Sequence, residues 1–318
     1  MAPLRPSRPQ VAAAALSAAV ALTASWIVLR GVRGAPDLRL RVLADDVRAT
    51  PRPEPPGQDP LPDDPRAWAY FLDRERAHRI FLSADARREY DPWAHFRDLY
   101  GFAYTHKWPE HPDGARTATT AILSLREDGE PADPPAQVRV LVAGDSHTNG
   151  ACNNDESFPA LLERRLANVP PARTAEGLHA ATGGYTFHHY AGTLRRSRAF
   201  RPHVFVVAVF GGNDFYEAAY LRHELAGTAR PPWDPAELAK RDRAVEVDPR
   251  VMGQGLASEH YFGLHPDEAA GALDASIAVV KQMQATCAEL GSELVVAFIP
   301  SPTSLEWPQP KPEVAAIR

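Results

Sequence analysis

The chain has 318 residues, which is enough for one large α/β domain with additional segments. Its 35 Lys and Arg residues and 40 Asp and Glu residues give a formal net charge of -5, without long runs of like charge. This balance provides no electrostatic basis for binding nucleic acid, so we expect no nucleic-acid partner.

The N-terminus contains an uncharged apolar stretch, VAAAALSAAVALTASWIVL, at residues 11–29. As a helix it would span about 28 Å, close to the roughly 30 Å hydrocarbon core of a bilayer. A cleaved signal peptide usually has a shorter apolar stretch and small residues at its cleavage site, where this chain has Trp26 and Ile27. We therefore favour an uncleaved, single-pass membrane anchor within residues 1–35 over a signal peptide or a buried core helix. The rest of the chain is then expected outside the cytoplasm, in the periplasm or the extracellular space.

Two segments separate this anchor from the main domain. Residues 36–66 include the Pro-rich, polar sequence ATPRPEPPGQDPLPDDPR, which predicts an extended linker. Residues 67–136 begin with the aromatic-rich sequences AWAYFLDRERAHRIFL and DPWAHFRDLYGFAY, and we interpret them as an N-terminal extension of the following domain. Residues 137–318 form the predicted main domain.

Strand and helix patterns alternate from residue 137 onward. Apolar runs predict buried strands, and amphipathic patterns with capping residues predict helices. The predicted strands are 138–144, 203–210 and 292–301, and the predicted helices are 156–169, 186–198 and 266–290. In the first helix Phe158, Leu161, Leu162 and Leu166 share one face, with Ser157 as the N-cap. This alternation predicts a three-layer α/β/α fold with an open, doubly wound parallel sheet.

Three short motifs follow or precede these elements. GDSHTNG comes after the first strand, HAATGGYTFHHY leads into a helix, and GGND ends the strand at 203–210. Ligands of open parallel sheets bind at the carboxyl ends of the strands, where Ser146, Gly184 and Asn213 are expected. In this order the motifs resemble those of the SGNH (GDSL-type) hydrolases. The preceding sequence AILSLREDGEP resembles the lead-in of their membrane-anchored bacterial members. The resemblance covers about residues 138–300 and implies a flavodoxin-like SGNH fold.

The resemblance assigns a role to each of these residues. Ser146 would be the nucleophile and its backbone N–H the first oxyanion donor, the Gly184 N–H the second, and the Asn213 amide the third. Ester hydrolysis needs such an activated hydroxyl and donors aimed at the developing oxyanion. Gly183 is a one-residue alternative to Gly184, and Asp214 would brace the loop after Asn213. The resemblance implies no metal and no other cofactor.

The general base of the family is a histidine three residues after an aspartate, beyond the last strand. None of the twelve histidines of this chain has an aspartate three residues before it, and none follows the last predicted strand. His147 adjoins Ser146, but adjacent side chains diverge, which makes it a poor base. His260 and His265 precede the long helix. We therefore expect the chain to lack a C-terminal helix, strand and Asp-x-x-His loop, so that the fold is incomplete at this end.

The resulting expectation is a serine-dependent hydrolase of ester bonds, with a small acyl ester or an acylated glycan as substrate. Removal or transfer of O-acetyl groups on a cell-surface glycan is included. One alternative is a non-catalytic SGNH-like domain that binds a glycan or an acyl group. A second, less favoured alternative is a metal-dependent phosphoesterase, because Asp145 and His147 form an Asp-x-His motif. The insertion at residues 227–263 is expected to wall the pocket, and Cys152 and Cys287 are expected to be unpaired thiols.

Overall fold

The computed structural model describes residues 64–82, 87–99, 103–107, 115–120, 125, 135–150, 152–169, 174–247 and 253–301. The chain divides into two compact units. Among the described residues, the sheet unit comprises those within 64–209 and 278–297, and the helical unit comprises those within 210–277 and 298–301. Most of the predicted anchor and linker lies outside the described residues. None of the described helices is both long and apolar enough to cross a membrane.

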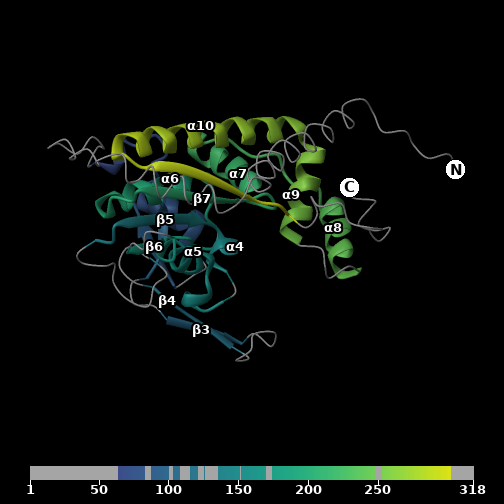
Figure 1. Ribbon diagram of the computed structural model, residues 1–318. Coiled ribbons are helices and arrows are strands. Elements are labelled where there is room, and N and C mark those ends of the chain that lie inside the picture. The colour runs from purple at the N-terminus through teal and green to yellow at the C-terminus, as the bar shows by residue number, and fades with distance from the viewer. Residues whose placement is uncertain are drawn as a thin grey trace. The chain divides into compact units, whose positions relative to one another are not determined.

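The sheet unit is built on a four-stranded parallel sheet in the order β6-β5-β7-β8 (Figure 1). Its strands are β5 (Val138–Gly144), β6 (Ala175–His179), β7 (Val204–Phe210) and β8 (Glu293–Ile299). In the register, Val142 of β5 pairs with His179 of β6 and with Val206 of β7. Numbered along the chain, the strand order is 2-1-3-4. The predicted α/β architecture with a parallel sheet is therefore confirmed.

Strands β5 and β7 form the centre of the sheet, and every residue of both strands is buried. Apart from Arg139 and Gly144 of β5, both strands consist of Val, Ala, Leu and Phe, which suit strands that are covered on both faces. On one face Val140, Val142 and Val206 pack with Leu162 and Leu166 of α5 (Phe158–Ala167). The strand β8 differs, because Val296 is 45% exposed and the strand lies at the edge of the sheet. The prediction of a buried strand was therefore wrong for β8.

Helix α5 begins as predicted, with the Ser157 side chain accepting a hydrogen bond from the Ala160 N–H. Its predicted apolar face is only partly used. Leu162 and Leu166, one turn apart, contact the sheet, whereas Leu161 is 46% exposed and Phe158 38% exposed. Leu161 lies 100° around the helix from Leu162, and Phe158 is in the first turn. The sheet therefore covers only the C-terminal part of the apolar face of α5.

The remaining helical elements of the sheet unit are short, except for α6 and the second half of α10. They are α4 (Ser146–Asn149), η4 (Asn154–Glu156), α6 (Phe187–Arg196), η5 (Arg198–Phe200) and residues 278–290 of α10 (Pro266–Leu290). Helix α6 packs on β5 and is buried along nearly its whole length. It starts at Thr186, whose N–H donates to His189 Nδ1 over 3.0 Å. Cys152 and Cys287 are not joined in a disulfide, and Cys287 is buried as expected, whereas Cys152 is only partly buried.

The N-terminal extension consists of short helical turns and two antiparallel hairpins. Its elements are η1 (Pro65–Ala67), α3 (Arg74–Ala77), η2 (His78–Leu82), β1 (Arg88–Asp91), β2 (His95–Asp98), β3 (Ala103–Lys107) and β4 (Ala115–Thr119). Strand β1 pairs with β2, and β3 pairs with β4. Phe96 of β2 is fully buried, and its ring lies 5.0 Å from the ring of Tyr185, near the start of α6. The β1–β2 hairpin is therefore packed against the segment that carries the glycine motif.

The helical unit contains α7 (Asp214–Ala226), α8 (Pro235–Val247), α9 (Gly253–Leu264) and residues 266–277 of α10. Helix α7 ends at Gly227, which has the left-handed backbone angle φ of 67° typical of a helix C-terminus. The insertion at residues 227–263 thus holds two helices, α8 and α9. They pack against each other, and Tyr261 of α9 lies edge-on to Tyr216 of α7.

Candidate active site

Ser146 lies just beyond the carboxyl end of β5, as the first residue of α4. The preceding residue, Asp145, caps this short helix and is fully buried, whereas Ser146 is exposed. The glycine that ends β5, Gly144, is required sterically, because a Cβ there would overlap the side chain of Thr148. None of the described residues forms a hydrogen bond with Ser146 Oγ. The turn therefore presents the serine hydroxyl outward at the predicted strand end.

Asp145 and His147 form a carboxylate–imidazole pair on either side of Ser146. The carboxylate accepts a hydrogen bond from the His147 backbone N–H over 2.9 Å, and its second oxygen lies 3.0 Å from His147 Nδ1. A neutral His147 that donates from Nδ1 carries its lone pair on Nε2, which is the form of the imidazole that can accept a proton. The sequence did not predict this pair. His147 follows Ser146 directly in the chain, and no hydrogen bond joins the two side chains in the described structure.

The glycine motif forms a tight turn from Thr182 to Tyr185. The Tyr185 N–H donates to the Thr182 carbonyl over 3.1 Å, and Gly184 has a φ of 84°. Gly183 has no positive φ, so the turn is of type II, which needs a glycine-like conformation at its third position. The Thr182 N–H donates to the Gly144 carbonyl over 3.2 Å, so the turn runs beside the end of β5.

The structure brings the glycine turn and the serine together. A Cβ placed on Gly183 would lie 3.7 Å from Ser146 Cβ and 3.8 Å from Arg88 Nη2. Gly184 is exposed, like Ser146. Ser146 and the Gly183–Gly184 turn thus lie close together in the sheet unit.

Residues of the N-terminal extension hold this turn, and the sequence motifs did not reveal them. Arg88 of β1 donates from Nη2 to the Gly183 carbonyl over 2.5 Å, and its guanidinium lies 4.4 Å from the centre of the Phe96 ring. The Tyr185 hydroxyl donates to the Phe96 carbonyl over 2.7 Å. Burial raises the pKa of Tyr185, so its hydroxyl stays protonated and remains a donor. The β1–β2 hairpin therefore contacts the turn at both Gly183 and Tyr185.

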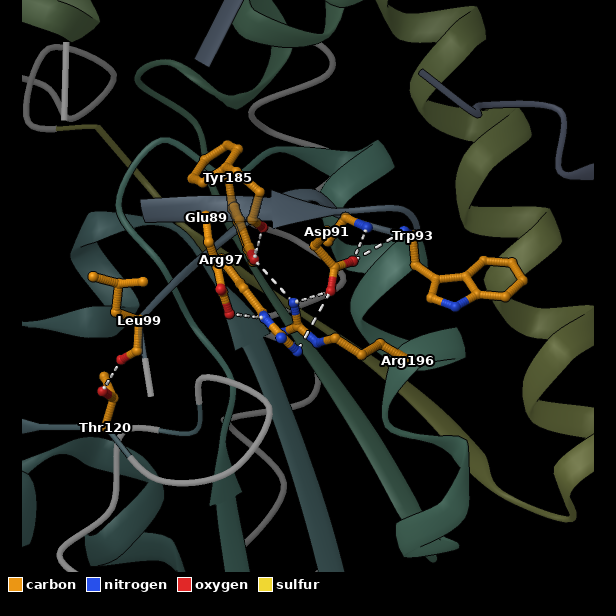
Figure 2. Close-up of polar contacts among 10 residues, drawn as sticks. Glu89, Asp91, Trp93, Arg97, Leu99, Thr120, Tyr185 and Arg196 are labelled. Atoms are coloured by element: carbon orange, nitrogen blue, oxygen red, sulfur yellow. Dashed lines mark hydrogen bonds and ion pairs between the residues drawn. The ribbon is translucent and has the colours of Figure 1, made fainter. Parts of the chain in front are cut away.

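A buried ion pair fixes the hairpin to α6 (Figure 2). The Asp91 carboxylate accepts the N–H groups of Trp93 and Ala94 over 2.9 and 2.7 Å and lies 3.4 Å from Arg196 Nη1. The same Nη1 atom lies 3.4 Å from the Tyr185 hydroxyl. The charges of Asp91 and Arg196 are thus compensated inside the unit, next to the tyrosine that follows the glycine turn.

Asn213, the third predicted residue, belongs to the helical unit and is described there by itself. It lies three residues after β7 as the N-cap of α7 and is 7% exposed. Its Oδ1 atom is buried and accepts no hydrogen bond within the described part of the chain. The next residue, Asp214, is fully buried, and its Oδ2 accepts the Phe210 N–H over 2.8 Å. This bond closes the GGND turn.

Four other histidines of the sheet unit are buried in the protein interior. His179 ends β6 and is buried, and His95, His188 and His189 are buried among aromatic rings. Within the described ranges, no group of three or more His, Cys, Asp or Glu residues could hold a metal ion. The Asp145 carboxylate, which a phosphoesterase would use as a metal ligand, is engaged by His147.

No protein-family model, no curated protein and no solved structure matches the chain. The function proposed below therefore depends on the motifs and on the geometry of the described residues.

Proposed function

We propose that the protein is a serine-dependent ester hydrolase of the SGNH type. The exposed Ser146 hydroxyl beside the Gly183–Gly184 turn carries this proposal. The strand order 2-1-3-4 agrees with a flavodoxin-like sheet, whose ligands bind where the strand order reverses, here between β5 and β7. Ser146 follows the end of β5 by two residues and thus lies at this switch point.

In the proposed reaction Ser146 Oγ attacks the ester carbonyl, and the alcohol leaves as the acyl-enzyme forms. Water then releases the acyl group and restores the serine. The negative charge on the carbonyl oxygen would be stabilised by the N–H groups of Ser146 and Gly184, each typically worth about 3 kcal/mol. The resemblance to SGNH hydrolases alone adds the Asn213 amide as a third donor. The base that accepts the serine proton is not assigned by the motifs. The adjacency of His147 to Ser146 makes it a poor base by sequence, although Asp145 orients its imidazole. Ester turnover by residues 1–318 would therefore mean that His147 or His265 reaches the serine.

The proposed substrate is a small acyl ester or an acylated glycan, and acetyl transfer is included beside hydrolysis. With the apolar segment 11–29 as an anchor, the enzyme would act outside the cytoplasm on cell-surface polymers.

The test is covalent labelling together with turnover. Purified protein is treated with a fluorophosphonate and assayed with p-nitrophenyl acetate and acetylated sugars, as wild type and as Ser146→Ala. We expect labelling at Ser146 and ester turnover in the wild type only, with unchanged thermal unfolding because the exposed hydroxyl fills no cavity. Ser292→Ala is the matched control, since Ser292 lies at the amino end of β8 and donates to the Pro202 carbonyl. Equal turnover by Ser146→Ala would refute the proposal.

A second candidate is a binding domain that holds an acyl group or glycan without turnover. The observation in its favour is that no described residue bonds to Ser146 Oγ to activate it. In that case acetylated sugars bind the wild type and Ser146→Ala with similar affinity, and neither protein releases acetate or is labelled.

A further inference from the structure

We infer that Arg88 is a positioning residue that aims the Gly184 N–H at the substrate oxyanion. The inference rests on the proposed function for the identity of this oxyanion. It extends that function to the N-terminal extension, which contributes an arginine to the site from a separate β-hairpin. The contact joins Arg88 Nη2 to the Gly183 carbonyl, across 95 positions of the sequence.

The peptide between Gly183 and Gly184 needs such an anchor. Type I and type II turns share the same closing hydrogen bond and differ mainly in the orientation of their central peptide. Here that peptide is flanked by two glycines, which lack the Cβ atoms that would favour one orientation. The hydrogen bond from Tyr185 to Thr182 therefore closes the turn without deciding which way the peptide faces.

Arg88 supplies the deciding contact. A trans peptide is planar, so its carbonyl and its N–H point in opposite directions. When Arg88 holds the Gly183 carbonyl, it also sets the direction of the Gly184 N–H. A charge-assisted hydrogen bond to the carbonyl further polarises the peptide and makes its N–H a better donor.

The arginine itself is held in place. Its guanidinium lies over the Phe96 ring at 4.4 Å, and Phe96 is fully buried in β2, paired with β1. The Phe96 carbonyl accepts the Tyr185 hydroxyl, so the residue after the glycines is tied to the same hairpin. A Cβ on Gly184 would lie 3.8 Å from Arg88 Nη2 and 3.9 Å from the Phe96 ring. Arg88 and Phe96 of the hairpin thus line the turn together.

The first test is steady-state hydrolysis of p-nitrophenyl acetate by Arg88→Met, Arg88→Lys and Arg97→Met. In Arg88→Met we expect kcat to fall about tenfold to hundredfold with KM changed less than twofold, because the donor acts on the transition state. Arg88→Lys should recover part of kcat, since an ammonium can donate but lacks the planar fork. Arg97, on the same hairpin, pairs with Glu89 at 2.7 Å and lies 4.0 Å from Asp91, but it has no interaction with the glycine turn among the described residues. It serves as the matched control, with unchanged kcat expected.

The second test does not depend on activity. The carbonyl ¹³C and amide ¹⁵N resonances of Gly183 and Gly184 are compared between wild type, Arg88→Met and Arg97→Met. Arg88→Met should shift the Gly183 carbonyl signal and add microsecond-to-millisecond exchange at the Gly184 amide, whereas Arg97→Met should do neither.

The outcomes distinguish failure of the Arg88 positioning role from failure of the proposed hydrolase function. If Ser146→Ala is inactive but Arg88→Met keeps the wild-type kcat, the proposed function stands and the role of Arg88 is overturned. Unchanged glycine resonances in Arg88→Met also overturn it. If the wild type neither turns over esters nor reacts with the fluorophosphonate, the proposed function fails. The resonances then decide alone whether Arg88 holds the turn.

Discussion

Three buried histidines should make the sheet unit sensitive to mild acid. His95 is completely buried, with Nε2 2.7 Å from the Tyr70 carbonyl, and burial lowers its pKa to about 4. Burial lowers the pKa of His188 to about 3 and, with the neighbouring charges of His95 and His188, lowers that of His189 well below its usual value. All three are therefore neutral in the folded protein at neutral pH.

The sign of the effect follows from proton binding. The unfolded chain protonates each histidine below a pKa of about 6.5, whereas the folded protein does not. Stability is therefore fully present above about pH 6.5 and is lost as the pH falls from there toward the folded-state values of about 4 and 3. At pH 5 each histidine costs about 2 kcal/mol, and the three together about 6 kcal/mol, comparable with the whole stability of many domains.

The assay is urea unfolding at pH 7.5, 6.0 and 5.0, followed by tryptophan fluorescence. His188→Phe keeps an aromatic ring edge-on to Tyr70 and should reduce the loss between pH 7.5 and 5.0 by about 2 kcal/mol. The exposed Leu161 provides the control, because Leu161→Ala removes no titratable group and should leave the pH dependence unchanged. Equal stability of the wild type at pH 7.5 and 5.0 would refute the burial argument. So would an undiminished loss in His188→Phe.

Two further substitutions test the polar groups of the site. Asn213→Ala should lower kcat for p-nitrophenyl acetate about a hundredfold or more by removing one oxyanion donor, and an unchanged kcat would exclude Asn213 from the reaction. Asp91→Asn should lower the free energy of unfolding by about 3–5 kcal/mol, because it leaves the Arg196 charge buried without its carboxylate. Urea unfolding at pH 7.5 measures this second change, and a loss below 1 kcal/mol would contradict it.

The sequence predicted the central elements of the sheet well, because their signals are local. The run at 138–144 became β5 and the pattern at 266–290 became α10, each with the predicted bounds. Strand β6 carries only the short sequence AEGLH and was not predicted. The exposure of Leu161 and Val296 was also missed, since it depends on how far neighbouring elements extend over them.

In the candidate site, too, the features set by local sequence were predictable and those set by long-range contacts were not. The exposure of Ser146 follows from seven consecutive residues in which Gly144, Asp145 and Thr148 shape one turn. The glycine at position 184 is likewise explained locally, because the turn needs a positive φ there. Arg88 gave no signal, because arginine is common on surfaces and its partner lies 95 residues further along the chain.

The histidine cluster and the glycine turn share the same support, which links stability to the site. The His189 ring stacks on Tyr185 at 5.1 Å, and His95 begins β2, the strand that accepts the Tyr185 hydroxyl at Phe96. Protonation within this cluster would place a buried charge against the residues that hold the turn. The turn depends on these long-range contacts, whereas the loop of Ser146 depends on bonds within its own few residues. Acid should therefore disturb the oxyanion side of the proposed site before it disturbs the nucleophile.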